Sequence, residues 1–239
     1  MTLQHNSALS DEPDATAAAA TVQQVEAARY AVLRRLAPSL RHHMVRPLQP
    51  IGLIYGVMHH KLSAAQPDLQ AVRQEAEKIN EFAKAAIEEC MDMGTWIAPE
   101  PDVFSRIDTA VRECVGLTAT MLHFCGFRLV NEVEELPAMV LRDAVRTVLS
   151  GVILAITDAL TTPAILLIRA AAGTADITLS VHIRPSGEGS VDRYDDGYRP
   201  LAWGDVQALA AAAQVGLARQ DQTVTLRFAA RPPANAETA

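Results

Sequence analysis

Two adjacent histidines, His42 and His43, precede Pro47 in a stretch whose apolar residues follow a helical pattern. Imidazole is a nucleophile near neutral pH, and enzymes use it to carry covalent intermediates. At about 100° per residue, His42 lies roughly opposite the apolar seam, and His43 lies at its boundary, roughly 80° away. We therefore expect His42 to face water, where a partner's active site can reach it.

Pro47 should distort this helix beside the histidines. Proline has no backbone N–H and costs about 3 kcal/mol in a helix interior. The carbonyl that loses its hydrogen bond belongs to His43, one turn earlier. We expect a bend at this point, with His43 and Pro47 supporting the exposed His42.

Two long amphipathic helices should carry these residues. The first runs from about residue 21 to 62, with one seam of apolar residues at three- and four-residue steps: Leu33, Leu36, Leu40, Met44, Leu48, Ile51, Tyr55, Met58 and Leu62. After a loop near residues 63–67, the second runs from about 68 to 96. An antiparallel helical hairpin is half of a four-helix bundle, so we expect a homodimer and assign residues 21–98 to this domain.

A second domain should follow the proline-rich junction at residues 98–101. The pattern there alternates between helices, near residues 103–124, 137–160 and 205–214, and strands, near 127–133, 164–171, 176–184, 217–219 and 223–229. The fold class is α+β. Residues 102–231 should form a sandwich with helices on one face of a mixed sheet.

The outer face of the first helix offers a surface for a partner. The same projection places five residues beside His42: Arg46, Gln49, Leu53, Gly56 and His60. An exposed leucine next to a small residue suits a partner helix, and arginine pairs with phosphoryl oxygens or acidic groups. A solvated face with one stray leucine is the alternative.

The segment His42-His43-Met44-Val45-Arg46-Pro47-Leu48 resembles the H-box of sensor histidine kinases, His-Glu-Leu-Arg-Thr-Pro-Leu. The resemblance implies that His42 is the phospho-acceptor and that the helical hairpin is the dimerisation and phosphotransfer domain. His43 replaces the family's acidic residue, which assists phosphorylation from ATP, and Val45 replaces its arginine. Both departures point away from ATP-driven autophosphorylation.

The second domain resembles the ATP-binding domain of histidine kinases in its element order, but its nucleotide motifs are degenerate. Asp158 stands in the position of the family's asparagine, and Leu154 in that of its glutamate. Residues 195–199 hold only the first half of the Asp-x-Gly-x-Gly motif, and residues 200–205 contain a single glycine. The resemblance therefore implies a kinase-like domain that does not bind ATP.

Histidine phosphotransferases of the sporulation and cell-cycle types have this make-up, and the chain resembles them over most of its length after residue 20. The resemblance implies that Nε2 of His42 relays a phosphoryl group between receiver-domain aspartates of response regulators. The receiver would supply Mg²⁺, and the chain would need no cofactor. Two alternatives stay open: a genuine sensor histidine kinase with divergent nucleotide motifs, and a non-enzymatic scaffold that binds a receiver.

Composition is consistent with a cytoplasmic signalling protein. The 239 residues are 49% hydrophobic and 21% charged, and the net charge of −7 argues against a nucleic-acid partner. No stretch has the length of a membrane span, and the cysteines show no metal-site spacing. Residues 1–20 and 232–239 lack periodicity, and we expect both to be flexible.

Overall fold

The computed structural model describes residues 12–187, 191 and 198–231. Helix α1, Glu12–Val45, includes residues 12–20, for which we expected no regular structure. Residues 1–11 and 232–239, the remainder of the two segments expected to be flexible, lie outside the described residues.

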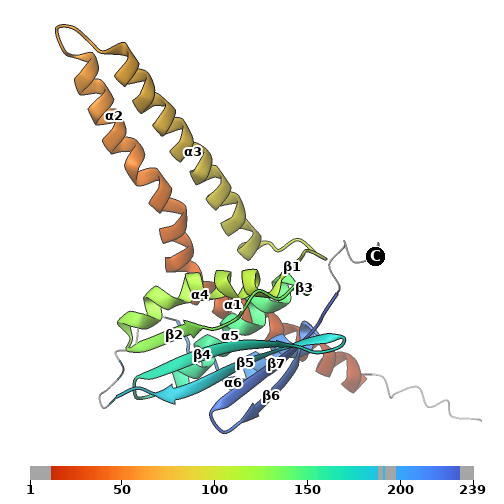
Figure 1. The fold of residues 1–239 in the computed structure, drawn as a ribbon. Helices are drawn as coiled ribbons and strands as arrows, with labels where there is room; N and C mark the ends of the chain where they lie inside the picture. Colours follow the sequence, from red (N-terminus) through yellow and green to blue (C-terminus); the bar gives the residue numbers. More distant parts are fainter. Residues whose placement is uncertain (1–11, 188–190, 192–197, 232–239) are drawn as a thin grey trace, which may run out of the picture.

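A helical hairpin projects from an α/β body (Figure 1). Helix α1 passes through a 3₁₀ turn, η1 (Arg46–Leu48), into α2 (Gln49–Leu62), and α3 (Leu69–Ile97) returns alongside. The Asp68 side chain caps α3 by accepting hydrogen bonds from the N–H groups of Gln70 and Ala71. Both expected helices are confirmed, and so is the distortion at Pro47, which lies within η1.

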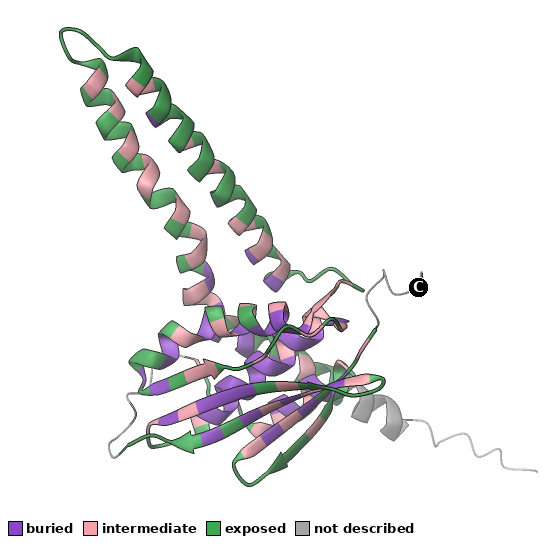
Figure 2. Cartoon of the chain, viewed as in Figure 1, coloured by how far each residue is buried: buried purple, intermediate pink, exposed green. Residues whose placement is uncertain are grey.

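The hairpin and the α/β body share one core at the base of the hairpin. Residues of α1 from Ala28 to Leu40 are buried in the same apolar cluster as α4, α5 and the sheet, as are Met93 and Trp96 of α3. Figure 2 shows burial concentrated in the body and exposure along the hairpin. The predicted division between residues 21–98 and 102–231 therefore separates chain segments but not two cores.

The body is the predicted α+β fold. Its mixed sheet has the order β2-β4-β5-β7-β6, with β2 parallel to β4 and the other pairs antiparallel. The strands are β2 (Phe127–Asn131), β4 (Ala164–Ala172), β5 (Asp176–Pro185), β6 (Gly216–Gln220) and β7 (Thr223–Ala229). Helices α4 (Ile107–Phe124), α5 (Arg142–Ala159) and α6 (Trp203–Ala212) complete it.

The sequence did not predict two short strands. Strand β1 (Phe104–Arg106) pairs antiparallel with β3 (Met139–Leu141) beside α4 and α5. The predicted helix start at residue 103 is therefore wrong, since α4 begins at Ile107. Strands of three residues are too short to show an alternating pattern.

Candidate functional site

His42 lies in the last turn of α1 and is exposed, as predicted. Its ring stands nearly perpendicular to that of His43, at an interplanar angle of 88° and a centroid separation of 6.3 Å. The side chain is therefore open to a partner that approaches the outside of the hairpin.

His43 points the other way, toward α3. Its Nδ1 lies 3.0 Å from Oε1 of Glu89, and the two side chains are only 23% and 28% exposed. A carboxylate accepts a hydrogen bond, so this contact places a proton on Nδ1. His43 thus contacts α3 through Glu89, which is 46 residues away and which the sequence analysis did not identify.

The backbone after His43 departs from the α-helix. Pro47 offers no N–H to the His43 carbonyl, and Pro50 offers none to the carbonyl of Arg46. The Gln49 N–H donates to Arg46 instead, which gives the tighter 3₁₀ turn. The break between α1 and α2 therefore follows directly from two prolines.

The predicted docking residues are all exposed. Arg46 lies in η1, and Gln49, Leu53, Gly56 and His60 follow along α2. Leu53 is 74% exposed, and a Cβ at Gly56 would meet no atom within 4 Å. An apolar side chain thus stands beside an open backbone position on the face that carries His42.

A second exposed strip lies on a different face of the hairpin. Large apolar side chains that are 44–70% exposed line η1, α2 and α3: Leu48, Tyr55, Leu62, Leu69, Ile87 and Met91. The sequence analysis placed Leu48, Tyr55 and Leu62 in the packed seam of the first helix. Within a single chain that prediction is wrong, because the partly buried Ile51, Ile54 and Met58 face α3 instead. On a helical projection the strip lies roughly 100° from the inward face on both helices. Since the helices are antiparallel, it forms one continuous side of the hairpin, away from His42.

In the α/β body, Asp158 is held by α1. The guanidinium of Arg35 donates two hydrogen bonds to this carboxylate, of 2.8 and 2.9 Å, and the Leu201 N–H donates a third of 2.8 Å. The Arg35 and Asp158 side chains are 7% and 12% exposed. Leu154, one turn earlier on α5, is fully buried. The two positions that resemble nucleotide-site positions are therefore a buried ion pair and a core residue.

Helix α1 lies against both α5 and α6 in this region. A Cβ at Gly151 of α5 would lie 3.1 Å from Leu209 of α6 and 3.8 Å from Val32 of α1, so the absent side chain permits close packing. Tyr198 adds an edge-on contact to Tyr30, at 5.5 Å between ring centroids. The helix thus packs against both α5 and α6.

The segment before α6 is fixed by an ion pair. Arg199 donates hydrogen bonds of 2.7 and 2.9 Å to Asp205, which also accepts from the Ala202 N–H. The Arg199 guanidinium lowers the pKa of the Asp205 carboxyl below its ordinary value. Residues 195–197 of the half-matched glycine motif lie outside the described residues.

A charge network joins the hairpin base to the body. Arg142 and Arg146 of α5 donate to Asp92 of α3 and Glu113 of α4 at 2.7–3.2 Å. The Arg146 guanidinium also stacks 4.4 Å from the centre of the Trp96 ring. The hydrogen bonds that Arg142 donates to Glu113 raise the pKa of Arg142 above its ordinary value. These contacts fix α3 against α4 and α5.

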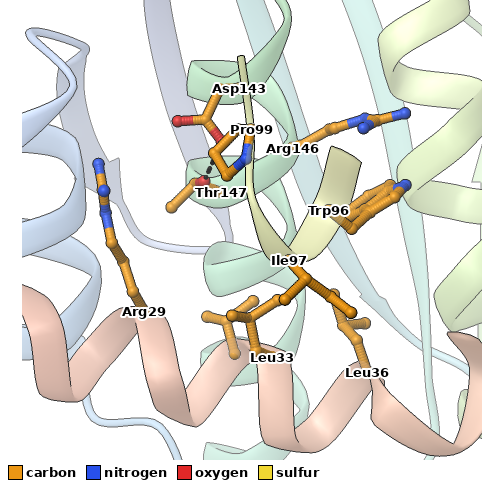
Figure 3. Close-up of a pocket in the computed structure, with 10 residues that line it drawn as sticks. Arg29, Leu33, Leu36, Trp96, Ile97, Pro99, Asp143, Arg146 and Thr147 are labelled. Carbon is orange, nitrogen blue, oxygen red and sulfur yellow. Dashed lines mark hydrogen bonds between the residues drawn. The ribbon is translucent and has the colours of Figure 1, made fainter. Parts of the chain in front are cut away.

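A pocket lies between α1, the end of α3 and α5 (Figure 3). Leu33, Leu36 and Ile97 give it an apolar lining, and the Thr147 hydroxyl bonds Asp143 at its polar edge. None of the predicted site residues lines this pocket.

Among the described residues, no group of three or more His, Cys, Asp or Glu side chains is placed to hold a metal ion. In the same part of the chain, no helix combines the length and apolar character needed to cross a bilayer.

No protein-family model and no curated protein matches the chain. Solved structures similar to it include the Acinetobacter baumannii histidine kinase AdeS, at 12% identity and a TM-score of 0.41 over 79% of this chain and 97% of that one. A bacterial phosphotransferase matches at 11% identity and a TM-score of 0.35, over 81% and 93%. The histidine kinase ThkA in complex with the response regulator TrrA matches at 12% and 0.40, over 87% and 64%. Likenesses at these values assign neither an activity nor a partner to this chain.

Proposed function

We propose that the chain is a histidine phosphotransferase of two-component signalling. It relays a phosphoryl group between His42 and receiver-domain aspartates, without ATP-driven autophosphorylation. The main support for the proposal is a pair of structural features, one on the hairpin and one in the body. An H-box-like histidine is exposed on the hairpin, while α1 packs against α5 and α6 of the kinase-like body and pairs with Asp158.

The exposed imidazole supports the acceptor role. Nε2 of His42 would attack the phosphorus of a receiver's aspartyl phosphate, forming an N–P bond as the acyl P–O bond breaks and the carboxylate leaves. A second receiver's aspartate would reverse the exchange. The receiver supplies Mg²⁺, so this chain contributes the nucleophile and its position.

The packing of α1 against the body supports the absence of ATP chemistry. Asp158 is neutralised by Arg35, and Leu154 offers no ligand atom, so neither residue is available to hold Mg²⁺. A nucleotide whose metal ion bound Asp158 would have to displace Arg35 of α1. That displacement would leave the Asp158 carboxylate buried without its cation.

The charge network also favours a relay over a kinase. A kinase body must carry bound nucleotide to the histidine. Here Arg142 and Arg146 tie α5 to Asp92 on the hairpin, next to the stacked Trp96. A body fixed in this way suits a phosphotransferase, whose body only has to hold the hairpin in place while receiver domains bind and dissociate.

A two-fold homodimer would cover the second exposed strip. Leu48 of η1 and Tyr55 and Leu62 of α2 lie on the same side of the hairpin as Leu69, Ile87 and Met91 of α3. A second copy that presents the same side completes a four-helix bundle and removes these side chains from water. The histidine face stays free for the receiver, which docks on Arg46, Gln49, Leu53, Gly56 and His60.

The test incubates the full chain with radiolabelled ATP and Mg²⁺ and, separately, with a receiver domain bearing a labelled aspartyl phosphate. His42→Ala and His43→Ala are the variants. We expect label only from the receiver and only when His42 is present. Label from ATP would favour the sensor-kinase alternative. Receiver binding that survives His42→Ala, with no phosphohistidine in wild type, would favour the scaffold.

A further inference from the structure

We propose that Glu89, acting through His43, is a positioning residue for phosphoryl transfer at His42. The inference rests on the proposed function and adds a component on α3 that the H-box resemblance does not contain. Glu89 lies on the neighbouring helix and touches His43, not the acceptor.

The backbone around the acceptor is short of hydrogen bonds. Pro47 and Pro50 remove two helical N–H donors within four residues, and the 3₁₀ turn that results has no side-chain cap at Val45. The turn that carries His42 therefore ends at a weak point of the helix. Something other than the helix's own ladder must hold it.

The contact between His43 and Glu89 provides that support. It joins the last turn of α1 to α3 at 3.0 Å, with both side chains about three-quarters buried. Partial burial shields the bond from solvent, which makes it stronger than a surface contact. Because Glu89 fixes the ring of His43, it also fixes the adjacent backbone from which His42 projects.

The rings of His42 and His43 point in different directions. They stand nearly perpendicular, with His43 turned toward α3 and His42 toward solvent. If the bond to Glu89 is lost, the last turn can rotate at the 3₁₀ break and carry His42 with it. A misplacement of about 1 Å in a reacting group can cost about 100-fold in rate.

The experiment measures single-turnover transfer from a phosphorylated receiver at saturating receiver, together with receiver affinity, for the full chain. Glu89→Ala should transfer about 10- to 100-fold more slowly, with receiver affinity within about twofold of wild type. Glu89→Gln should transfer within about threefold of wild type, because its amide oxygen still accepts from Nδ1. The exposed neighbour Glu88→Ala is the matched control and should be unchanged.

A double-mutant cycle adds a second readout. If Glu89 acts only through His43, the variant lacking both side chains should be no slower than the slower single variant. Wild-type transfer by Glu89→Ala, equal slowing in Glu89→Gln and Glu89→Ala, or additive losses would each overturn the inference. If wild type takes no label from the receiver, the proposed function fails instead, so the two failures are distinguishable.

Discussion

Arg35 of α1 and Asp158 of α5 form a two-pronged ion pair at 2.8 and 2.9 Å, 123 residues apart in the sequence. The pair joins the helix that leads to His42 to the position where the resemblance would place a nucleotide ligand. This ion pair therefore joins α1 to the body and neutralises the Asp158 carboxylate.

Arg35→Ala should destabilise the fold strongly. Removing the cation leaves a carboxylate that is 12% exposed with only the Leu201 N–H, and breaking a buried pair typically costs about 3–5 kcal/mol. Urea unfolding followed by circular dichroism measures the loss. Arg34→Ala, at the exposed neighbouring position, is the control and should cost less than about 1 kcal/mol. Equal losses in the two variants would show that the pair contributes nothing special.

Gly151→Val should weaken the packing of α1 against α5 and α6. The new side chain would enter space bounded by Leu209 at 3.1 Å and Val32 at 3.8 Å, and overpacking costs about 1–3 kcal/mol. Gly116→Val on α4 is a matched helical control, since a Cβ there meets nothing within 4 Å, and it should stay within about 0.5 kcal/mol of wild type. Thermal melts of both proteins make the comparison. A neutral Gly151→Val would contradict the close packing.

The ion pair of Asp205 and Arg199 should contribute to the acid stability of the body. The pKa of Asp205 is lowered on folding by Arg199, so the contribution is present above the ordinary value of 3.8 and disappears as the pH falls through the lower folded value. Asp205→Asn should therefore lose about 1–2 kcal/mol at neutral pH, and the difference from wild type should shrink as the pH falls below 3.8. Urea titrations between pH 2 and 7 measure this. A difference that stays constant with pH would mean that the carboxylate charge is not involved.

If the proposed homodimer forms, substitutions at two apolar positions on the hairpin should affect dimerisation differently. Ile87→Glu places charge in the exposed strip proposed as the bundle interface and should give a monomer by sedimentation velocity. Leu53→Glu lies on the His42 face and should leave the dimer intact while weakening receiver binding by about 1 kcal/mol or more. A monomeric wild type, or an unaffected Ile87→Glu, would contradict the bundle.

Much of the fold follows from local pattern. Residue spacing within single segments was enough to predict the helical hairpin, the break at Pro47 and the exposure of His42. It also predicted where the five strands of the large sheet lie along the chain. The strands β1 and β3 were missed because three residues do not establish a period.

The contacts made by α1 are not local and so could not be predicted. Ala28 and Ala31 are fully buried, yet small residues in an alanine-rich helix give no amphipathic signal. Arginine is usually exposed in proteins, and only the fold shows that Arg35 is buried against Asp158. The helical spacing of Ala28, Val32, Arg35 and Leu36 puts these residues on one face of α1, but it does not identify what that face packs against. In the same way, the contact of His43 with Glu89 depends on the register of α1 against α3.

In the proposed function, His42 receives phosphoryl groups from a receiver domain and not from ATP. The most direct measurement is transfer of radiolabel from a purified phosphorylated receiver domain to the full chain, with acid-labile and base-stable label located by proteolysis and mass spectrometry. We expect label on His42 in wild type and, at a reduced rate, in His43→Ala, and no label in His42→Ala or from ATP. Label on His43, or labelling by ATP alone, would contradict it.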